Sequence, residues 1–188
     1  PLCLVDEGMP VQRALSLVLD SMEEDANRRR QATDLAYTAL RTGQRSAYVV
    51  DRLLPRPEKL PPLFKTCLAL AASALLFEEH APAHAIVHET VEDVRALFGK
   101  GLDRVANGAL RSLQRLGGAP LERGFYRMAS RYREVDIDSR FYSLPRSIVR
   151  LWRQELGPEP ASKLMARSFP RPCAGGRLNK NKPGREQA

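Results

Sequence analysis

Two sets of arginines recur at helical spacing in the last third of the sequence. They are Arg123, Arg127 and Arg131 at every fourth residue, and Arg146, Arg150 and Arg153 at i, i+4 and i+7. On an α-helix each spacing places its arginines on one face. A planar guanidinium suits the geometry of a phosphate group, so these two faces predict contact with a nucleic-acid backbone. The alternative is a pair of solvated helix faces with no ligand.

Aromatic residues interleave with these arginines and can stack on unpaired bases. They are Tyr126, Tyr132, Tyr142 and Trp152. The same residues also fit a core beneath the basic faces. For Trp152, which is in phase with Val149 and Leu156, the core is the better interpretation.

Five more arginines are candidate RNA ligands. They are Arg28, Arg29, Arg30, Arg111 and Arg115. The triplet at 28–30 follows acidic residues at 23–25, so it also fits a charge-balanced loop. Asp103, Asn107 and Arg111 lie at i, i+4 and i+8, a spacing that suits either RNA contact or the tying together of helix ends inside a bundle.

The three histidines are the only pattern that suggests a metal. His80, His84 and His88 are four residues apart, with glutamates close by. Helical zinc sites of the H-E-x-x-H type require Glu directly after the first histidine, whereas Ala85 follows His84 here. We therefore expect no metal ligand and no catalytic residue among them.

The elements that position these side chains are predicted to be helices throughout. Apolar periodicity indicates helices over about residues 11–22, 27–41, 46–54, 62–77, 84–98, 102–116 and 121–132, one over 144–156 capped by Ser143, and a short one ending near residue 168. Gly43 is predicted to end the second, and Pro55 with Pro57 the third. No segment alternates as a strand does, which predicts an all-α chain with about six helices in the main bundle.

The net charge of +8 is unevenly distributed over the 188 residues. Residues 1–120 carry 15 basic and 15 acidic side chains, whereas residues 121–188 carry 15 basic and 7 acidic ones. Arginine supplies 24 of the 30 cations, which suits RNA and equally fits GC-rich codon usage. With the break at Gly117 and Gly118, the sequence predicts a helical bundle over 1–118, an Arg-rich helical extension over 119–169, and a flexible tail or the start of a linker over 170–188.

The cysteines and the apolar segments indicate in which cellular compartment the chain is expected. Cys3, Cys67 and Cys173 are odd in number and have no C-x-x-C spacing, which fits a reducing cytosol. The most apolar stretch, residues 63–77, is shorter than the roughly 20 residues needed to span a bilayer. We therefore expect a cytoplasmic chain that does not enter a membrane.

Several motifs follow one another in an order known from one family. Pro82 and His84 precede an E-T-V core at 89–91, and the next predicted helix carries N-x-x-L-R at 107–111. Upstream stands LAYTALRTGQRSAYVVDRLLPRP, and downstream YSLPRSIVRLWRQELGPEPASKLMARSFPRP followed by GRLN. Over about residues 11–179 the chain resembles the NusB-type RNA-binding fold, in the version that precedes the catalytic domain of Sun/Fmu (RsmB-type) rRNA cytosine-C5 methyltransferases.

This resemblance implies an RNA-binding, substrate-positioning domain that is not catalytic on its own. The family's nucleophilic cysteine stands in a Pro-Cys pair, but Pro172 and Cys173 lack the Asp-Ala before them and the strand that would hold them. A glycine-rich loop after a strand is also absent from the sequence. No cofactor is expected in this chain; S-adenosylmethionine is expected in a missing catalytic domain, which would be a partner together with rRNA.

Two other functions remain open at this point. A free-standing NusB-type antitermination factor would bind a leader RNA together with a ribosomal protein, although about 70 residues follow the helix at 102–116, where such factors usually end. A structural helical module for dimerisation or docking would bind no RNA at all.

Overall fold

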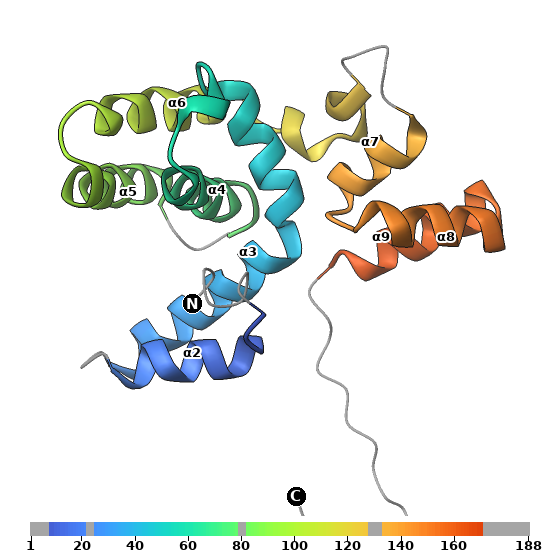
Figure 1. Ribbon diagram of the computed structural model, residues 1–188, viewed down its shortest axis with the longest axis horizontal. Coiled ribbons are helices and arrows are strands. Elements are labelled where there is room, and N and C mark those ends of the chain that lie inside the picture. The colour runs from blue at the N-terminus through green and yellow to red at the C-terminus, as the bar shows by residue number, and fades with distance from the viewer. Residues whose placement is uncertain (1–7, 22–24, 79–81, 128–132, 171–188) are drawn as a thin grey trace, which may run out of the picture.

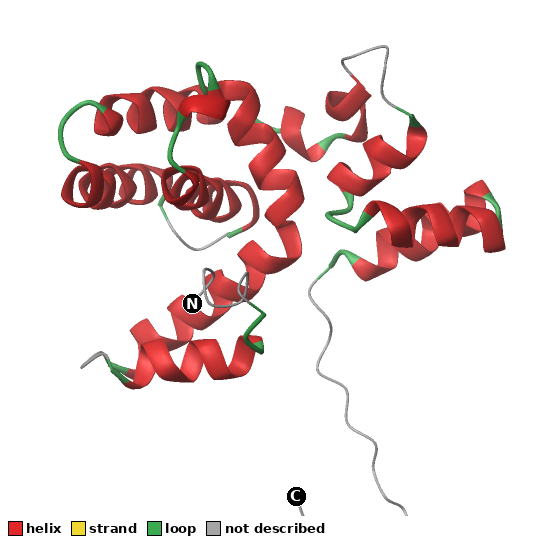
Figure 2. Ribbon diagram, viewed as in Figure 1, coloured by secondary structure: helices red, strands yellow, loops and turns green. Residues whose placement is uncertain are grey.

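The computed structural model describes residues 8–21, 25–78, 82–127 and 133–170, and all regular structure in these ranges is helical (Figure 2). The predicted all-α class is therefore confirmed. The α-helices are α2 (Val11–Asp20), α3 (Ala26–Leu53), α4 (Pro62–Phe77), α5 (Ala83–Phe98), α6 (Leu102–Leu116), α7 (Glu134–Phe141), α8 (Arg146–Leu156) and α9 (Pro158–Ser168). Short 3-10 helices are η1 (Pro57–Lys59), η2 (Ala119–Leu121) and η3 (Arg123–Arg127).

Helix α3 is the central element of the molecule. Figure 1 shows α4, α5 and α6 on one side of it and α7, α8 and α9 on the other, with α2 near its first half. Arg29 of α3 forms an ion pair with Asp20 of α2 at 3.6 Å. The single helix α3 thus carries both groups of helices.

The two helices predicted over 27–41 and 46–54 are one helix, so the prediction that Gly43 ends a helix was wrong. Contacts with α4 explain the continuity. The Ser73 hydroxyl lies 2.9 Å from the Thr42 hydroxyl and 2.8 Å from the Ser46 hydroxyl, and all three residues are buried. A glycine inside a helix costs about 1 kcal/mol, which this packing offsets. The Asp25 side chain begins the helix by accepting a hydrogen bond from the Arg28 backbone N–H at 2.8 Å.

The main core lies between α3, α4, α5 and α6. Its fully buried members include Val49, Phe64, Leu68, Val94 and Ala106. The proline-bounded α4 and the helices α5 and α6 agree closely with the predicted ranges.

The core continues past residue 118, because Tyr126 and Ile137 belong to it. A second, smaller cluster joins Val149 of α8 to Ala161 and Met165 of α9, and the half-buried Trp152 packs against it, as predicted. The boundary at residue 118 stays a prediction.

The turn between α5 and α6 is fixed by one carboxylate. Gly99 and Gly101 have φ values of 76° and 122°, which other residues rarely adopt. Asp103, buried at the start of α6, accepts hydrogen bonds from the Gly101 backbone N–H at 2.9 Å and from Arg95 Nε of α5 at 3.0 Å. The bonds from Gly101 and Arg95 lower the pKa of Asp103 below its ordinary value. The glycines break the helix as predicted, and Asp103 holds the break in one geometry.

The extension differs most from prediction. The helix predicted over 121–132 is replaced, within the described residues, by η2 and η3, and α7 was not predicted. Pro145 takes the cap position of α8, so Ser143 is not the cap. Ser143 has a φ of 52°, and its hydroxyl accepts a hydrogen bond from the Arg45 backbone N–H at 3.0 Å. Contact with α3 therefore decides its conformation.

Candidate nucleic-acid interface

A buried arginine joins the extension to the bundle. Arg45 of α3 is 3% exposed, and its Nη2 and Nε donate to the Pro120 carbonyl at 2.9 and 3.2 Å. Nε also lies 3.2 Å from the Tyr126 hydroxyl, which itself donates to the same carbonyl at 2.9 Å. Sequence reasoning missed this residue, because its partners are far away in the chain.

Four aromatic rings surround the same guanidinium. The centroids of Phe77, Tyr126, Phe141 and Phe169 lie 4.3–5.8 Å from its central carbon. These rings come from the end of α4, from η3, from the end of α7 and from just after α9. The cation is therefore held at the meeting point of both groups of helices, and the surfaces of the bundle and the extension are fixed relative to each other.

The arginines predicted to bind phosphate in the extension gather around acidic side chains. Asp138 of α7 is fully buried and accepts from Arg123 Nε at 2.8 Å and from Arg153 Nη2 at 2.6 Å. Glu134, one turn earlier, accepts from Arg123 and lies 3.6 Å from Arg127 Nη2 and 3.8 Å from Arg153 Nη2. The hydrogen bond from Arg123 lowers the pKa of Glu134. Much of this positive charge is compensated inside the extension.

The remaining arginines of the two predicted faces have different environments. Arg146 Nε pairs with Asp136 at 2.8 Å, whereas Arg150 is exposed and has no ion pair within the described residues. Arg131 lies outside them. Arg123 and Arg127 stand on a 3-10 helix of about three residues per turn, so a spacing of four residues places them about 120° apart. The single α-helical face predicted for them was wrong.

The triplet at 28–30 lies in the first turns of α3, so its interpretation as a loop was wrong. Arg29 pairs with Asp20, and the Asp25 side chain caps the helix just before the triplet. Arg30 is exposed. The triplet is thus a helix start accompanied by acidic residues.

Helix α6 carries a basic surface of a different kind. Arg104, Arg111 and Arg115 lie at i, i+7 and i+11 and are all exposed, so they form one line along the helix, which we name the α6 stripe. Arg111 Nε donates to the Asn107 side-chain oxygen at 3.0 Å, and Arg115 Nη2 donates to the Ser112 hydroxyl at 2.8 Å. These partners are neutral. None of the ion pairs among the described residues involves the stripe, so its three charges remain available to a ligand.

Asn107 and Arg111 bond to each other on α6 and do not tie helix ends together. That role belongs to Asp103, the first member of the predicted i, i+4, i+8 set. Of the two interpretations of this set, the structure therefore assigns the internal one to Asp103 and leaves Arg111 on the surface.

A groove between α5 and α6 borders the stripe and encloses about 310 Å³. Its apolar lining residues are Val87 and Val91, which we name its floor. Its polar lining includes His84, His88, Glu92, Asn107, Arg111 and Gln114. In the part of the chain that the structure describes, no group of three or more His, Cys, Asp or Glu side chains could hold a metal; His80 and Cys173 lie outside that part.

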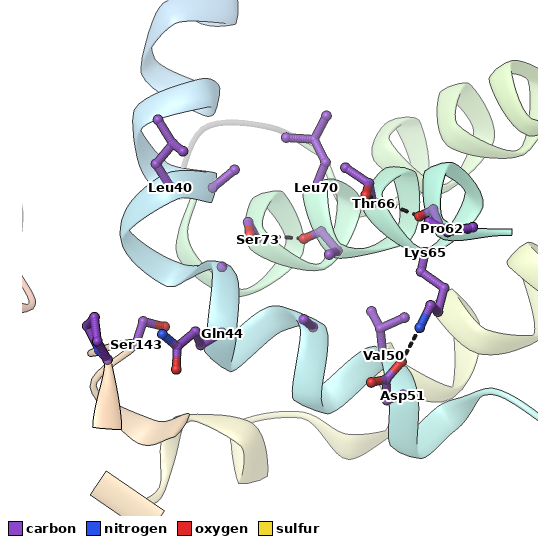
Figure 3. A pocket seen from close by; sticks show the side chains of 15 residues that line it. Leu40, Gln44, Val50, Asp51, Pro62, Lys65, Thr66, Leu70, Ser73 and Ser143 are labelled. Carbon is purple, nitrogen blue, oxygen red and sulfur yellow. Dashed lines mark hydrogen bonds and ion pairs between the residues drawn. The ribbon is translucent and has the colours of Figure 1, made fainter. Parts of the chain in front are cut away.

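A larger groove of about 640 Å³ lies between α3 and α4, beside Ser143 and Pro145 (Figure 3). Leu40, Val50 and Leu70 give it an apolar lining, and its two charged residues, Lys65 and Asp51, pair with each other at 3.8 Å. Figure 3 shows this pair at one end of the groove. With its one cation compensated, this groove is poorly suited to a polyanion. No helix among the described residues is long and apolar enough to cross a membrane.

Comparison with known proteins matches residues 5–115 to the NusB family. The chain is 29% identical over 150 residues to the probable ribosomal RNA small subunit methyltransferase B of Bacillus subtilis. This match covers 80% of the chain and 32% of that protein. It is 37% identical over 109 residues to the ribosomal RNA small subunit methyltransferase B of Thermus thermophilus, covering 58% of the chain and 27% of that protein.

A probable methyltransferase of the same name from Synechocystis is 28% identical over 158 residues, covering 84% of the chain and 34% of that protein. The chain thus spans about a third of the length of these curated relatives. No solved structure is significantly similar to it. Because the family model covers more than half of the residues and the helices agree with its all-α fold, the chain belongs to the NusB family.

Proposed function

We propose that this chain is the RNA-binding, substrate-positioning domain of an rRNA (cytosine-C5) methyltransferase. The observation that carries the proposal is the reach of the similarity. A match over 158 of 188 residues leaves 30 outside, so it extends at least to residue 158 and includes η2, η3, α7 and α8. The Synechocystis relative is therefore similar to the bundle and to most of the extension. This favours a methyltransferase over a free-standing antitermination factor.

The chemistry of the residues suggests which steps this chain performs and which it does not. The described residues present cations and hydrogen-bond donors, and the methyl transfer with its S-adenosylmethionine is assigned to residues outside this chain. The bundle over 1–118 and the extension over 119–169 act together in holding RNA, because Arg45 fixes one against the other. We place the protein in the cytoplasm, where its cysteines remain reduced.

The α6 stripe is the proposed main contact with the RNA backbone. Its three guanidinium groups are exposed, those of Arg111 and Arg115 have neutral partners, and none forms an ion pair among the described residues, so a phosphate gains their charge without displacing a carboxylate. Among the described arginines of the two predicted faces, Arg150 is the best placed for the same reason. Arg123 and Arg153 would first have to leave the buried Asp138.

The salt dependence of binding tests this assignment. We expect fluorescence anisotropy with labelled single-stranded fragments of small-subunit rRNA to show log affinity falling linearly with log salt. Changing Arg104, Arg111 and Arg115 to Gln removes three exposed cations. If each meets one phosphate, the slope should flatten by about 2, since single strands contribute about 0.7 per contact.

A matched triple variant changes Arg13, Arg56 and Arg167 to Gln. These arginines are also exposed, and the change in net charge is the same. The control slope should stay within about 0.5 of the wild type if general charge is not the cause. Equal flattening in both variants would reject the α6 stripe as the interface. Absence of measurable RNA binding by the wild type would reject the proposed function itself.

A further inference from the structure

The groove between α5 and α6 combines an apolar floor with polar walls. We infer that it binds one unpaired nucleotide of the RNA, with the base in the groove and the adjacent phosphate on Arg111. This inference rests on the proposed function and specifies which chemical form of RNA the domain holds. Unpaired bases that are splayed out of a strand are the usual targets of sequence-specific RNA recognition.

The floor and the volume suit the flat face of a base. Val87 is 7% exposed, and Val91 is half-buried beside it, so the bottom of the groove offers apolar contact. The volume of about 310 Å³ equals the share of about ten water molecules in the liquid. The groove therefore has room for a base, whose entry releases water from an apolar surface.

The walls supply groups that can read the edge of a base. Gln114 is exposed, and its amide both donates and accepts hydrogen bonds. The Asn107 side-chain oxygen accepts from Arg111, and Asn107 also lines the groove, where its NH2 group can act as a further donor. Exposed His88 stands on the opposite helix, where its ring can stack or bond. Such a mixture of donors and acceptors suits a base better than a simple anion.

The charges around the groove suit a phosphate at its border. Arg111 Nε is held by the Asn107 oxygen at 3.0 Å, so the guanidinium is oriented while both of its Nη groups remain able to donate. The carboxylate of Glu92 in the lining pairs with Arg95 Nη1 at 2.8 Å, so its charge is compensated in part, since Arg95 also donates to Asp103. Arg115, one turn beyond Arg111, continues the stripe for the next phosphate.

The test compares RNA with and without bases. Affinities are measured for a 12-nucleotide oligouridine and for an abasic strand of the same length. The wild type should prefer oligouridine, and the double variant His88→Ala, Gln114→Ala should reduce this preference by about five-fold or more, the lower end of what one stacked base contributes. Gln154→Ala, which removes an exposed amide from α8, is the matched control and should leave the preference unchanged.

Arg111→Gln distinguishes the phosphate from the base. It should weaken binding of the intact and abasic strands by the same factor, because both retain the backbone. Ring signals of His84 and His88 in NMR spectra of the wild type give a readout that needs no variant. They should move when oligouridine is added and stay in place with the abasic strand.

Three results would overturn the inference. An unchanged base preference in the folded double variant would show that the base lies elsewhere, and an equal loss on both strands would make the groove a phosphate site only. In both cases RNA binding persists and the proposed function stands. No binding of either strand by the wild type would reject the proposed function and the inference together, and would leave the groove to a protein partner.

Discussion

Replacing Arg45 by Met tests whether the buried guanidinium holds the extension to the bundle. The change keeps an apolar stem of similar length and removes the hydrogen bonds to the Pro120 carbonyl and the Tyr126 hydroxyl. Hydrogen bonds from a charged donor contribute about 1.5–3 kcal/mol each, and desolvated contacts with aromatic rings about 2 kcal/mol. Part of this loss is offset because Met carries no charge, so the folded state no longer includes the desolvation penalty of a buried guanidinium.

The net loss is further limited because Tyr126 continues to donate to the Pro120 carbonyl, which is therefore not left unpaired. We expect the free energy of unfolding to fall by about 2–4 kcal/mol. Arg45→Lys should restore little of it, because an ammonium group lacks the planar fork that donates from two positions and stacks on rings.

Urea unfolding followed by two signals measures this effect. The single tryptophan, Trp152, lies in α8 and reports on the extension, whereas circular dichroism reports on all helices. In Arg45→Met the fluorescence transition should move to lower urea than the dichroism transition, since the extension is released first. Arg30→Met, at an exposed site on the same helix, should change the free energy by less than about 0.5 kcal/mol. If Arg45→Met lowered the free energy of unfolding by less than about 1 kcal/mol, the role of Arg45 in holding the extension to the bundle would be refuted.

Three further outcomes follow from the packing and the ion pairs. Leu68→Ala, at a fully buried site in α4, should lower the free energy of unfolding by about 2–5 kcal/mol in urea titrations. Asp138→Asn should cost about 1.5–3 kcal/mol by the same assay, because it removes the buried charge that accepts from Arg123 and Arg153 while Glu134 still compensates them in part; an effect no larger than that of an exposed carboxylate change would contradict this. Asp103 and Glu134 have lowered pKa values in the folded chain, so their stabilising contribution is complete above their unfolded pKa of about 4 and is lost as the pH falls through the folded value. The urea concentration at the unfolding midpoint should therefore decrease when the pH is lowered below about 4, and Asp103→Asn should make this dependence on pH shallower.

The helices predicted best are those whose boundaries are set locally. Proline before α4 and the glycines around α5 and α6 mark ends that do not depend on distant partners. Gly43 carried the same local signal, but Ser73 of α4 binds the hydroxyl groups on either side of it and keeps α3 continuous. Helix α7 has eight residues and buries Asp138 in place of an apolar side chain, so its sequence lacks the stripe that indicates a helix.

The acidic partners of the predicted arginines could not be foreseen from the sequence for a related reason. Periodicity shows which arginines share a helix face, but it does not show which carboxylates the other helices bring to that face. Asp136 and Asp138 stand on α7, which was not predicted, and they pair with Arg146, Arg123 and Arg153. Arg45 was overlooked because it lies in a polar run, and its burial is determined by residues between 32 and 124 positions downstream.

The distribution of charge along the chain is therefore a poor guide to which positive charges are free to meet a ligand. The extension holds the excess of basic residues, yet Asp138 and Glu134 use several of them to hold η3, α7 and α8 together. Helix α6 lies in the half with no net charge, but its acidic residue, Asp103, faces the turn to α5 and leaves the arginines of the stripe uncompensated. A ligand responds to charge that is exposed and unpaired, and the α6 stripe with its adjoining groove meets this criterion, which is why we propose it as the surface that holds an RNA strand.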